Sequence, residues 1–132
     1  MKNAIIVFNL ILFTLLFSSC DKDENLVERT MEITIISPTS ETELSLDETL
    51  SIRATISANF ELHGYSWKIY PFNNQNNVIA ENNKHTHGEL ISVDDEWENT
   101  SIEGKELILE FTAVADHSGE NNKKEFVQFV VK

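Results

Sequence analysis

The side chains best suited to metal binding in this 132-residue chain are those of its four histidines, His63, His85, His87 and His117. His85 and His87 are two positions apart, so in an extended strand both imidazoles project from the same face. Neutral imidazole binds Zn²⁺, Cu²⁺ and Ni²⁺, and two or three imidazoles with one carboxylate can hold such an ion. The sequence therefore predicts a copper or zinc site formed by His85, His87, His117 and the neighbouring Asp116, with His63 as its weakest member.

The same histidines also have a simpler interpretation. Exposed loop histidines are common, and a His-x-His pair such as His85-Thr86-His87 occurs by chance. His63 stands beside Gly64 and is then only a cap at the start of its strand. In this interpretation the protein binds no metal and needs no cofactor, and the sequence leaves both interpretations open.

A second group of polar side chains surrounds Trp97. Asp94, Asp95, Glu96 and Glu98 offer the oxygen ligands that Ca²⁺ prefers, but their spacing does not match an EF-hand loop. We expect a solvated acidic turn here, with Trp97 at the bottom of the core. The alternative for Trp97 is an exposed platform on which a sugar stacks.

Motifs of the common enzyme classes are absent from the sequence. It contains no Gly-x-Ser-x-Gly elbow, no phosphate-binding loop and no His-Glu-x-x-His pair. We therefore predict that the protein is not an enzyme and has no catalytic residue.

The start of the chain has the features of an export signal. A short basic head precedes the apolar run 4–17, which is too short to cross a bilayer because a span needs ~20 residues. Ser18 and Ser19 then lead to Cys20, the only cysteine. A basic head, an apolar run and small residues at the boundary are typical of a secretory signal peptide.

Small residues directly before a lone cysteine resemble the lipobox of bacterial lipoproteins, although Phe17 stands where that motif usually has leucine. The resemblance implies a signal peptide over 1–19, lipidation of Cys20 and an anchor in the outer membrane. The alternatives are an ordinary cleavage site near a free thiol, or a segment that stays uncleaved as an anchor. Residues 20–24 also resemble a surface-export tag of some Gram-negative bacteria, which implies the cell surface, with the periplasmic face as the alternative.

The acidic composition limits the classes of molecule that we expect the protein to bind. The whole chain has 22 acidic and 10 basic residues, and removal of 1–19 takes away only Lys2, which leaves a formal charge of −13. This charge disfavours nucleic acid and anionic lipid headgroups as partners. We expect contact with the membrane through the lipid anchor, and with another envelope protein or a glycan. With its one cysteine at position 20, the folded part has no disulfide.

Residues 20–30 are polar and non-periodic, so we expect a lipidated cysteine followed by a flexible acidic tether. From Met31 the chain shows short β-patterns separated by turn residues. The predicted strands are 32–36, 50–57, 65–69, 78–80, 89–93, 107–115 and 126–131. Seven short strands in about a hundred residues predict one all-β, immunoglobulin-like β-sandwich domain over 31–132, with Trp67 in its core.

The turn Asp116–Asn121 resembles the Asp-x-x-Gly-Asn turn of bacterial immunoglobulin-like modules, except for the extra Glu120. Together with the leader, the chain resembles small immunoglobulin-like lipoproteins of Gram-negative bacteria. This resemblance implies fold and location, not activity. It favours a lipid-anchored binding or structural module with an unknown ligand, and the alternative is a small metal-binding lipoprotein.

Strand order predicts where the histidines lie. If consecutive strands run in opposite directions, the loops near residues 58–63, 81–88 and 116–122 share one end of the sandwich. All four histidines fall in or beside these loops, and the acidic group around Trp97 falls at the other end.

Overall fold

The computed structural model describes residues 27–132, and the predicted signal peptide and Cys20 lie outside this range. The described chain forms six strands: β1 (Met31–Ser37), β2 (Glu43–Leu44), β3 (Thr49–Pro71), β4 (Ala80–Glu98), β5 (Lys105–Val114) and β6 (Asn122–Val131). None of residues 27–132 lies in a helix long and apolar enough to span a membrane. The predicted all-β class is confirmed.

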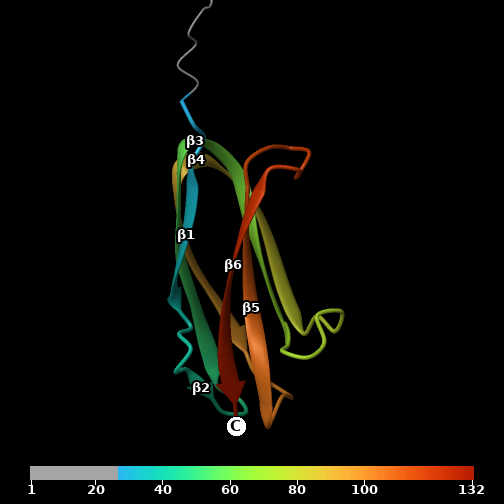
Figure 1. Ribbon diagram of the computed structural model, residues 1–132. Coiled ribbons are helices and arrows are strands. Elements are labelled where there is room, and N and C mark those ends of the chain that lie inside the picture. Colours follow the sequence, from blue (N-terminus) through green and yellow to red (C-terminus); the bar gives the residue numbers. More distant parts are fainter. Residues whose placement is uncertain (1–26) are drawn as a thin grey trace, which may run out of the picture.

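The strands form a curled sheet whose two halves face each other as an immunoglobulin-like sandwich (Figure 1). One half contains β1, the first part of β3 and the second part of β4. The other half contains the first part of β4, the second part of β3, then β5 and β6. The two-residue β2 adds to the end of β6 in parallel. The long strands β3 and β4 thus belong to both halves.

This continuity differs from the predicted strand list. The expected strands 50–57 and 65–69 are joined in the 23 residues of β3. Of the expected strand 78–80 only Ala80 is in a strand, and it begins the 19 residues of β4, which also contain 89–93. The prediction of a loop over 81–88 was wrong. Gly64 and Gly88 lie where the strands bend, with φ of 147° and 148°, a conformation that L side chains rarely adopt. The glycines let each strand turn from one half to the other without ending.

The bend also brings β3 and β4 unusually close. A Cβ atom added to Gly64 would lie 2.4 Å from the carbonyl oxygen of Lys84. Gly64 pairs with His85 on β4 and with Val114 on β5, so this contact fixes where the neighbouring histidines stand.

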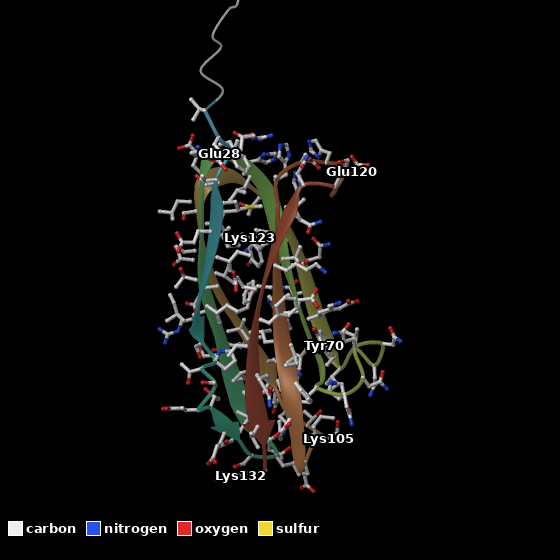
Figure 2. All side chains as sticks on the ribbon, in the orientation of Figure 1. Glu28, Tyr70, Lys105, Glu120, Lys123 and Lys132 are labelled. Atoms are coloured by element: carbon white, nitrogen blue, oxygen red, sulfur yellow. The ribbon has the colours of Figure 1, made fainter. Side chains whose placement is uncertain are left out.

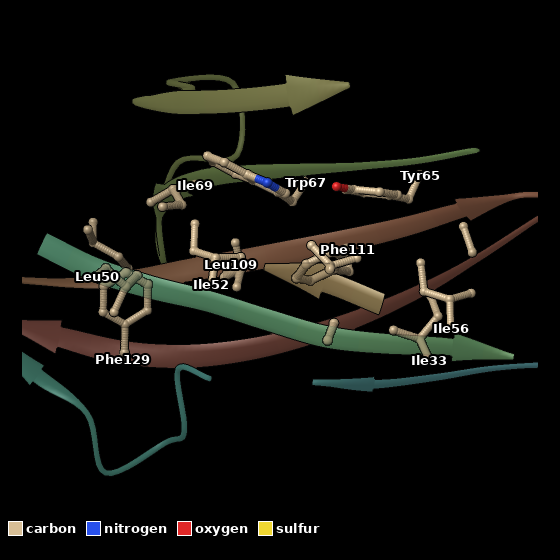
Figure 3. Close-up of a cluster of buried hydrophobic side chains, with 14 of the residues drawn as sticks. Ile33, Leu50, Ile52, Ile56, Tyr65, Trp67, Ile69, Leu109, Phe111 and Phe129 are labelled. Carbon is tan, nitrogen blue, oxygen red and sulfur yellow. The ribbon is translucent and has the colours of Figure 1, made fainter. Parts of the chain in front are cut away.

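The core fills the space between the two halves, as Figure 3 shows for its main side chains. Ile52 and Ile56 in the first part of β3 are fully buried, as are Leu109 and Phe111 in β5. Trp67 is 5% exposed, which confirms its predicted place in the core. Apolar residues at every second position supply this surface, which is the alternation expected of strands covered on one face.

The acidic group near Trp97 is part of β4, so the prediction of a solvated acidic turn was wrong. Asp95 accepts hydrogen bonds from the indole of Trp67 at 2.8 Å, and from Tyr65 and Asn82 at 3.3 Å each. Burial and the Asp95 carboxylate raise the pKa of Tyr65 to about 12. Asp95 therefore joins the two halves of the sheet, and Trp97 packs half-buried against the core.

Candidate functional site

The four histidine rings gather at one end of the sandwich. We call this the histidine end, formed by the bends of β3 and β4 and by the β5–β6 loop at residues 58–64, 85–88 and 115–121. The centroid of the His63 ring is 4.8 Å from that of His87 and 4.3 Å from that of His117. The His85 ring lies 4.7 Å from His87 and 5.8 Å from His117. The segments that strand order placed at one end thus do bring all four imidazoles together, although His63, His85 and His87 lie on bent strands and only His117 lies in a loop.

His87 is at the centre of the polar contacts in this cluster. Its Nδ1 lies 3.2 Å from Oε1 of Glu61, and its Nε2 lies 3.0 Å from Nε2 of His85. Ligand atoms of Glu61, His63 and His87 all lie within 4.8 Å of one another. Glu61 was not singled out from the sequence, although its position two residues before His63 on a strand places both side chains on one face.

Asp116, the carboxylate that we expected in this site, is engaged elsewhere. Its Oδ1 accepts hydrogen bonds from the Ser118 hydroxyl at 2.7 Å and from the Gly119 amide at 2.9 Å, and its Oδ2 accepts one from Asn121. The hydrogen bonds from Asn121 and Ser118 lower the pKa of Asp116 to about 2. Its oxygens therefore hold the β5–β6 turn, and Glu61 is the carboxylate in contact with the histidines.

His63 is the most enclosed of the four histidines. Its ring is half-buried, whereas His85, His87 and His117 are exposed. Burial and the neighbouring His117 and His87 lower the pKa of His63 from its ordinary value, against the opposing effect of Glu61. His63 is therefore neutral at neutral pH, which is the form of imidazole that binds metal ions. A hollow of about 290 Å³ opens beside His63, His85 and His117.

The chain enters the domain at this same end. The side chain of Asn59, at the β3 bend, accepts a hydrogen bond from the Thr30 amide at 2.9 Å and donates one to the Glu28 carbonyl at 2.7 Å. The guanidinium of Arg29 stands 4.0 Å above the ring of Phe60. Figure 2 shows Glu28 at the same end of the domain as Glu120 in the β5–β6 loop. The segment that leads to Cys20 therefore leaves the domain next to the histidines.

The opposite end carries a different kind of surface. A hollow of about 420 Å³ lies between the β3–β4 loop and the start of β5, with Phe72 57% exposed at its rim. Asn73, Asn74 and Asn77 line it with amides. Lys105 and Lys132 lie at this end (Figure 2). It combines an aromatic face with hydrogen-bonding groups.

Comparisons with known proteins define the fold. The chain is similar to a solved structure of fibronectin(III)-like modules of CbhA from Clostridium thermocellum, with a TM-score of 0.52 and 18% sequence identity. The match covers 80% of this chain and 48% of that chain, so this protein spans about half the length of the solved one. No protein-family model matches the sequence, and no curated protein does. The domain has a fibronectin(III)-like, immunoglobulin-like β-sandwich fold.

Proposed function

We propose that this protein is a lipid-anchored domain on the cell-surface face of the bacterial outer membrane that serves as a binding or structural module, with the periplasmic face as the alternative location. The leader 1–19 and the lone Cys20 support the anchor. The fold supports the role, because a fibronectin(III)-like, immunoglobulin-like sandwich is suited to a structural or binding role. The lack of the common catalytic motifs supports a non-enzymatic function.

The observation that carries this proposal is the position of the chain entry. Residues 28–30 are held against the β3 bend, so an anchor at Cys20 would tether the domain by its histidine end. Seven residues lie between Cys20 and Glu28, so the eight Cα–Cα steps span at most about 28 Å. The histidine end would then face the membrane, and the Phe72 hollow would face outward.

The outward end is the surface that we propose for a partner. Phe72 offers an apolar ring, and the amides around it donate and accept hydrogen bonds, a combination that suits a glycan or the polar surface of another envelope protein. The charge of −13 on the mature chain repels phosphate groups, which argues against nucleic acid. It also keeps the domain off anionic headgroups, so that the lipid is its link to the membrane.

Detergent partition tests the anchor directly. We expect the wild-type protein to enter the detergent phase of Triton X-114 and a Cys20→Ser variant to stay in the aqueous phase or retain its leader. Mass spectrometry of the mature protein should show acyl chains on Cys20. An unacylated mature protein would refute the anchor. Proteolysis of intact cells then separates the two faces, because a periplasmic domain is protected until the outer membrane is opened.

A further inference from the structure

We propose that Glu61, His63 and His87 form a binding site for one Zn²⁺ or Cu²⁺ ion at the histidine end of the domain. An anchored contact module does not require such a site, so this inference goes beyond the function proposed above and is tested independently of it.

The donor atoms are of the right kind. Imidazole nitrogen and carboxylate oxygen are the common ligands of zinc, and imidazole also suits copper. Ca²⁺ and Mg²⁺ prefer oxygen ligands alone, whereas this cluster offers two imidazole nitrogens, from His63 and His87, and one carboxylate oxygen, from Glu61. The chemistry of the cluster therefore selects a transition-metal ion.

The spacing of the donors fits as well. Bonds of about 2.0–2.2 Å to a tetrahedral zinc ion place two ligand atoms about 3.3 Å apart. Nδ1 of His87 and Oε1 of Glu61 are 3.2 Å apart. An ion can take the place of the proton that bridges these two atoms. The proton of the ring then lies on Nε2, which stands 3.0 Å from Nε2 of His85.

This arrangement gives His85 a separate role. A histidine that binds a metal through one nitrogen usually hydrogen-bonds a neighbour through the other, which fixes the ring and its tautomer. The contact between His85 and His87 supplies such a support. We therefore assign His85 as a positioning residue for His87, not as a ligand.

His63 supplies the third ligand. Its Nδ1 is the one side-chain nitrogen or oxygen within residues 27–132 that is buried and has no hydrogen-bond partner. A buried polar atom without a partner costs free energy, and such atoms are rare in folded proteins. A bound ion would satisfy this nitrogen. The His117 ring lies nearest to that of His63, 4.3 Å away between centroids.

The scaffold holds these side chains on strands rather than on mobile loops. Glu61 and His63 share one face of β3, and His85 and His87 share one face of β4. The close approach at Gly64 sets the distance between the two strands. Sites built on strands hold their ligands more precisely than sites on loops. This placement favours a metal site over a chance cluster of histidine side chains.

Calorimetric titration of the protein, extracted in mild detergent and stripped with EDTA, tests the proposal. We expect Zn²⁺ to bind saturably with one ion per chain, and Ca²⁺ to give no heat. Zinc at a hundred times its Kd should raise the Tm by about 10 °C. Cu²⁺ should give an electron paramagnetic resonance spectrum with nitrogen hyperfine lines, and these report on this cluster because all four histidines lie in it.

Substitutions separate ligands from supports. Loss of a residue that hydrogen-bonds a metal ligand costs ~10–100-fold in metal affinity, so His85→Ala should weaken zinc binding by a factor in that range. His87→Ala and His63→Ala remove ligands and should weaken zinc binding by more. Thr86→Ala, between the two histidines of β4, is the matched control and should bind as the wild type does. Glu61→Gln should weaken binding, whereas Glu89→Gln, an exposed acid on the same strand as His87, should not.

The variants must fold for these comparisons to count. The His87 side chain is 44% exposed, so its removal should leave the metal-free urea midpoint unchanged. His87→Ala therefore decides the question even if His63→Ala unfolds the domain. Absence of saturable Zn²⁺ and Cu²⁺ binding, or equal affinity in the wild type and His87→Ala, would overturn the proposal.

Discussion

The two ends of the sandwich differ in whether their buried polar side chains are hydrogen-bonded. At the end far from the chain entry, Asn99 is fully buried. Its side chain donates to the carbonyls of Ser45 and Ile102, at 3.1 Å and 2.8 Å, and accepts from the Ile102 amide at 2.9 Å. At the histidine end, Nδ1 of His63 has no partner among the described residues. A satisfied buried group holds a loop in place, whereas an unsatisfied one is open to a ligand.

The ends also differ in how the chain leaves them. The far end is closed by the C-terminal strand, where the Lys132 amide donates to the Leu44 carbonyl at 2.9 Å and the Val130 amide donates to that of Thr42 at 3.1 Å. The histidine end holds the segment that leads to the proposed anchor. The comparison suggests that the far end stabilises the fold and that the histidine end carries a site, and four changes test this division.

The largest expected effect is that of Gly64→Ala, because Gly64 serves both the fold and the site. The new Cβ would meet the Lys84 carbonyl oxygen at 2.4 Å, at a φ of 147°. We expect the free energy of unfolding, measured in urea, to fall by about 3 kcal/mol, and zinc binding to weaken because His85 moves with its strand. Gly104→Ala is the matched control: its φ is 61° but no atom lies within 4 Å, so the loss should be only about 1 kcal/mol. Equal losses would show that the close approach is unimportant.

A smaller effect, confined to stability, is expected for Asn99→Ala. The substitution leaves the carbonyls of Ser45 and Ile102 and the Ile102 amide without their partner. We expect a loss of about 2 kcal/mol in the free energy of unfolding and no change in the Kd for zinc. If Asn99→Ala changed zinc affinity as much as His87→Ala does, the two ends would not be independent.

The strands show how much of the fold could be predicted from the sequence. Alternating apolar residues predicted most strand segments, because period-two burial is local and strong. The junctions were missed, since Gly64 and Gly88 read as turn residues although the strands bend there and continue. The two-residue β2 is too short to have a period.

For the candidate site, strand order was enough to predict that the histidines meet, because antiparallel order places the segments near 58–63, 81–88 and 116–122 at one end even though the first two are bends within β3 and β4 and not loops. The carboxylate was harder to predict. The chain has 22 acidic residues, and the i, i+2 relation of Glu61 to His63 does not set it apart, because Glu89 has the same relation to His87. Asp116 was the expected partner because it adjoins His117, but neighbours in a strand or turn point in different directions, and its oxygens serve the turn.

A moderate, pH-dependent effect should arise away from both ends. Glu110 in β5 is 5% exposed and accepts hydrogen bonds from Lys124 at 2.7 Å and from Tyr70 at 3.0 Å, beside Lys68 at 3.3 Å. Burial alone would raise the pKa of Glu110, but the bonds from Lys124 and Tyr70 and the charges of the two lysines together lower it below 4.5.

The sign of the pH effect follows from that lowered pKa. The charged Glu110 stabilises the fold above the unfolded-state pKa, and this contribution is lost as the pH falls through the folded-state value. The difference in urea midpoint between the wild type and Glu110→Gln should therefore be largest near neutral pH and shrink below pH 4.5. A difference that stayed constant on acidification would mean that the ionised form of Glu110 is not what stabilises the domain. Zinc affinity should not change in Glu110→Gln, since the residue belongs to neither end.

The smallest effect is expected for Asp116→Asn, the substitution that distinguishes the two candidate carboxylates at the histidine end. The Asp116 oxygens already accept three hydrogen bonds within their own turn, and a pKa of about 2 keeps the group charged at neutral pH. Asparagine keeps one acceptor and loses the bond from Asn121, which should loosen the β5–β6 loop only. Zinc affinity should change by less than the ~10-fold expected for an outer-shell partner, while Glu61→Gln should exceed it. A larger loss of zinc affinity in Asp116→Asn than in Glu61→Gln would make Asp116 the ligand and would require the turn to open when metal binds. The two variants therefore identify the carboxylate ligand with either result.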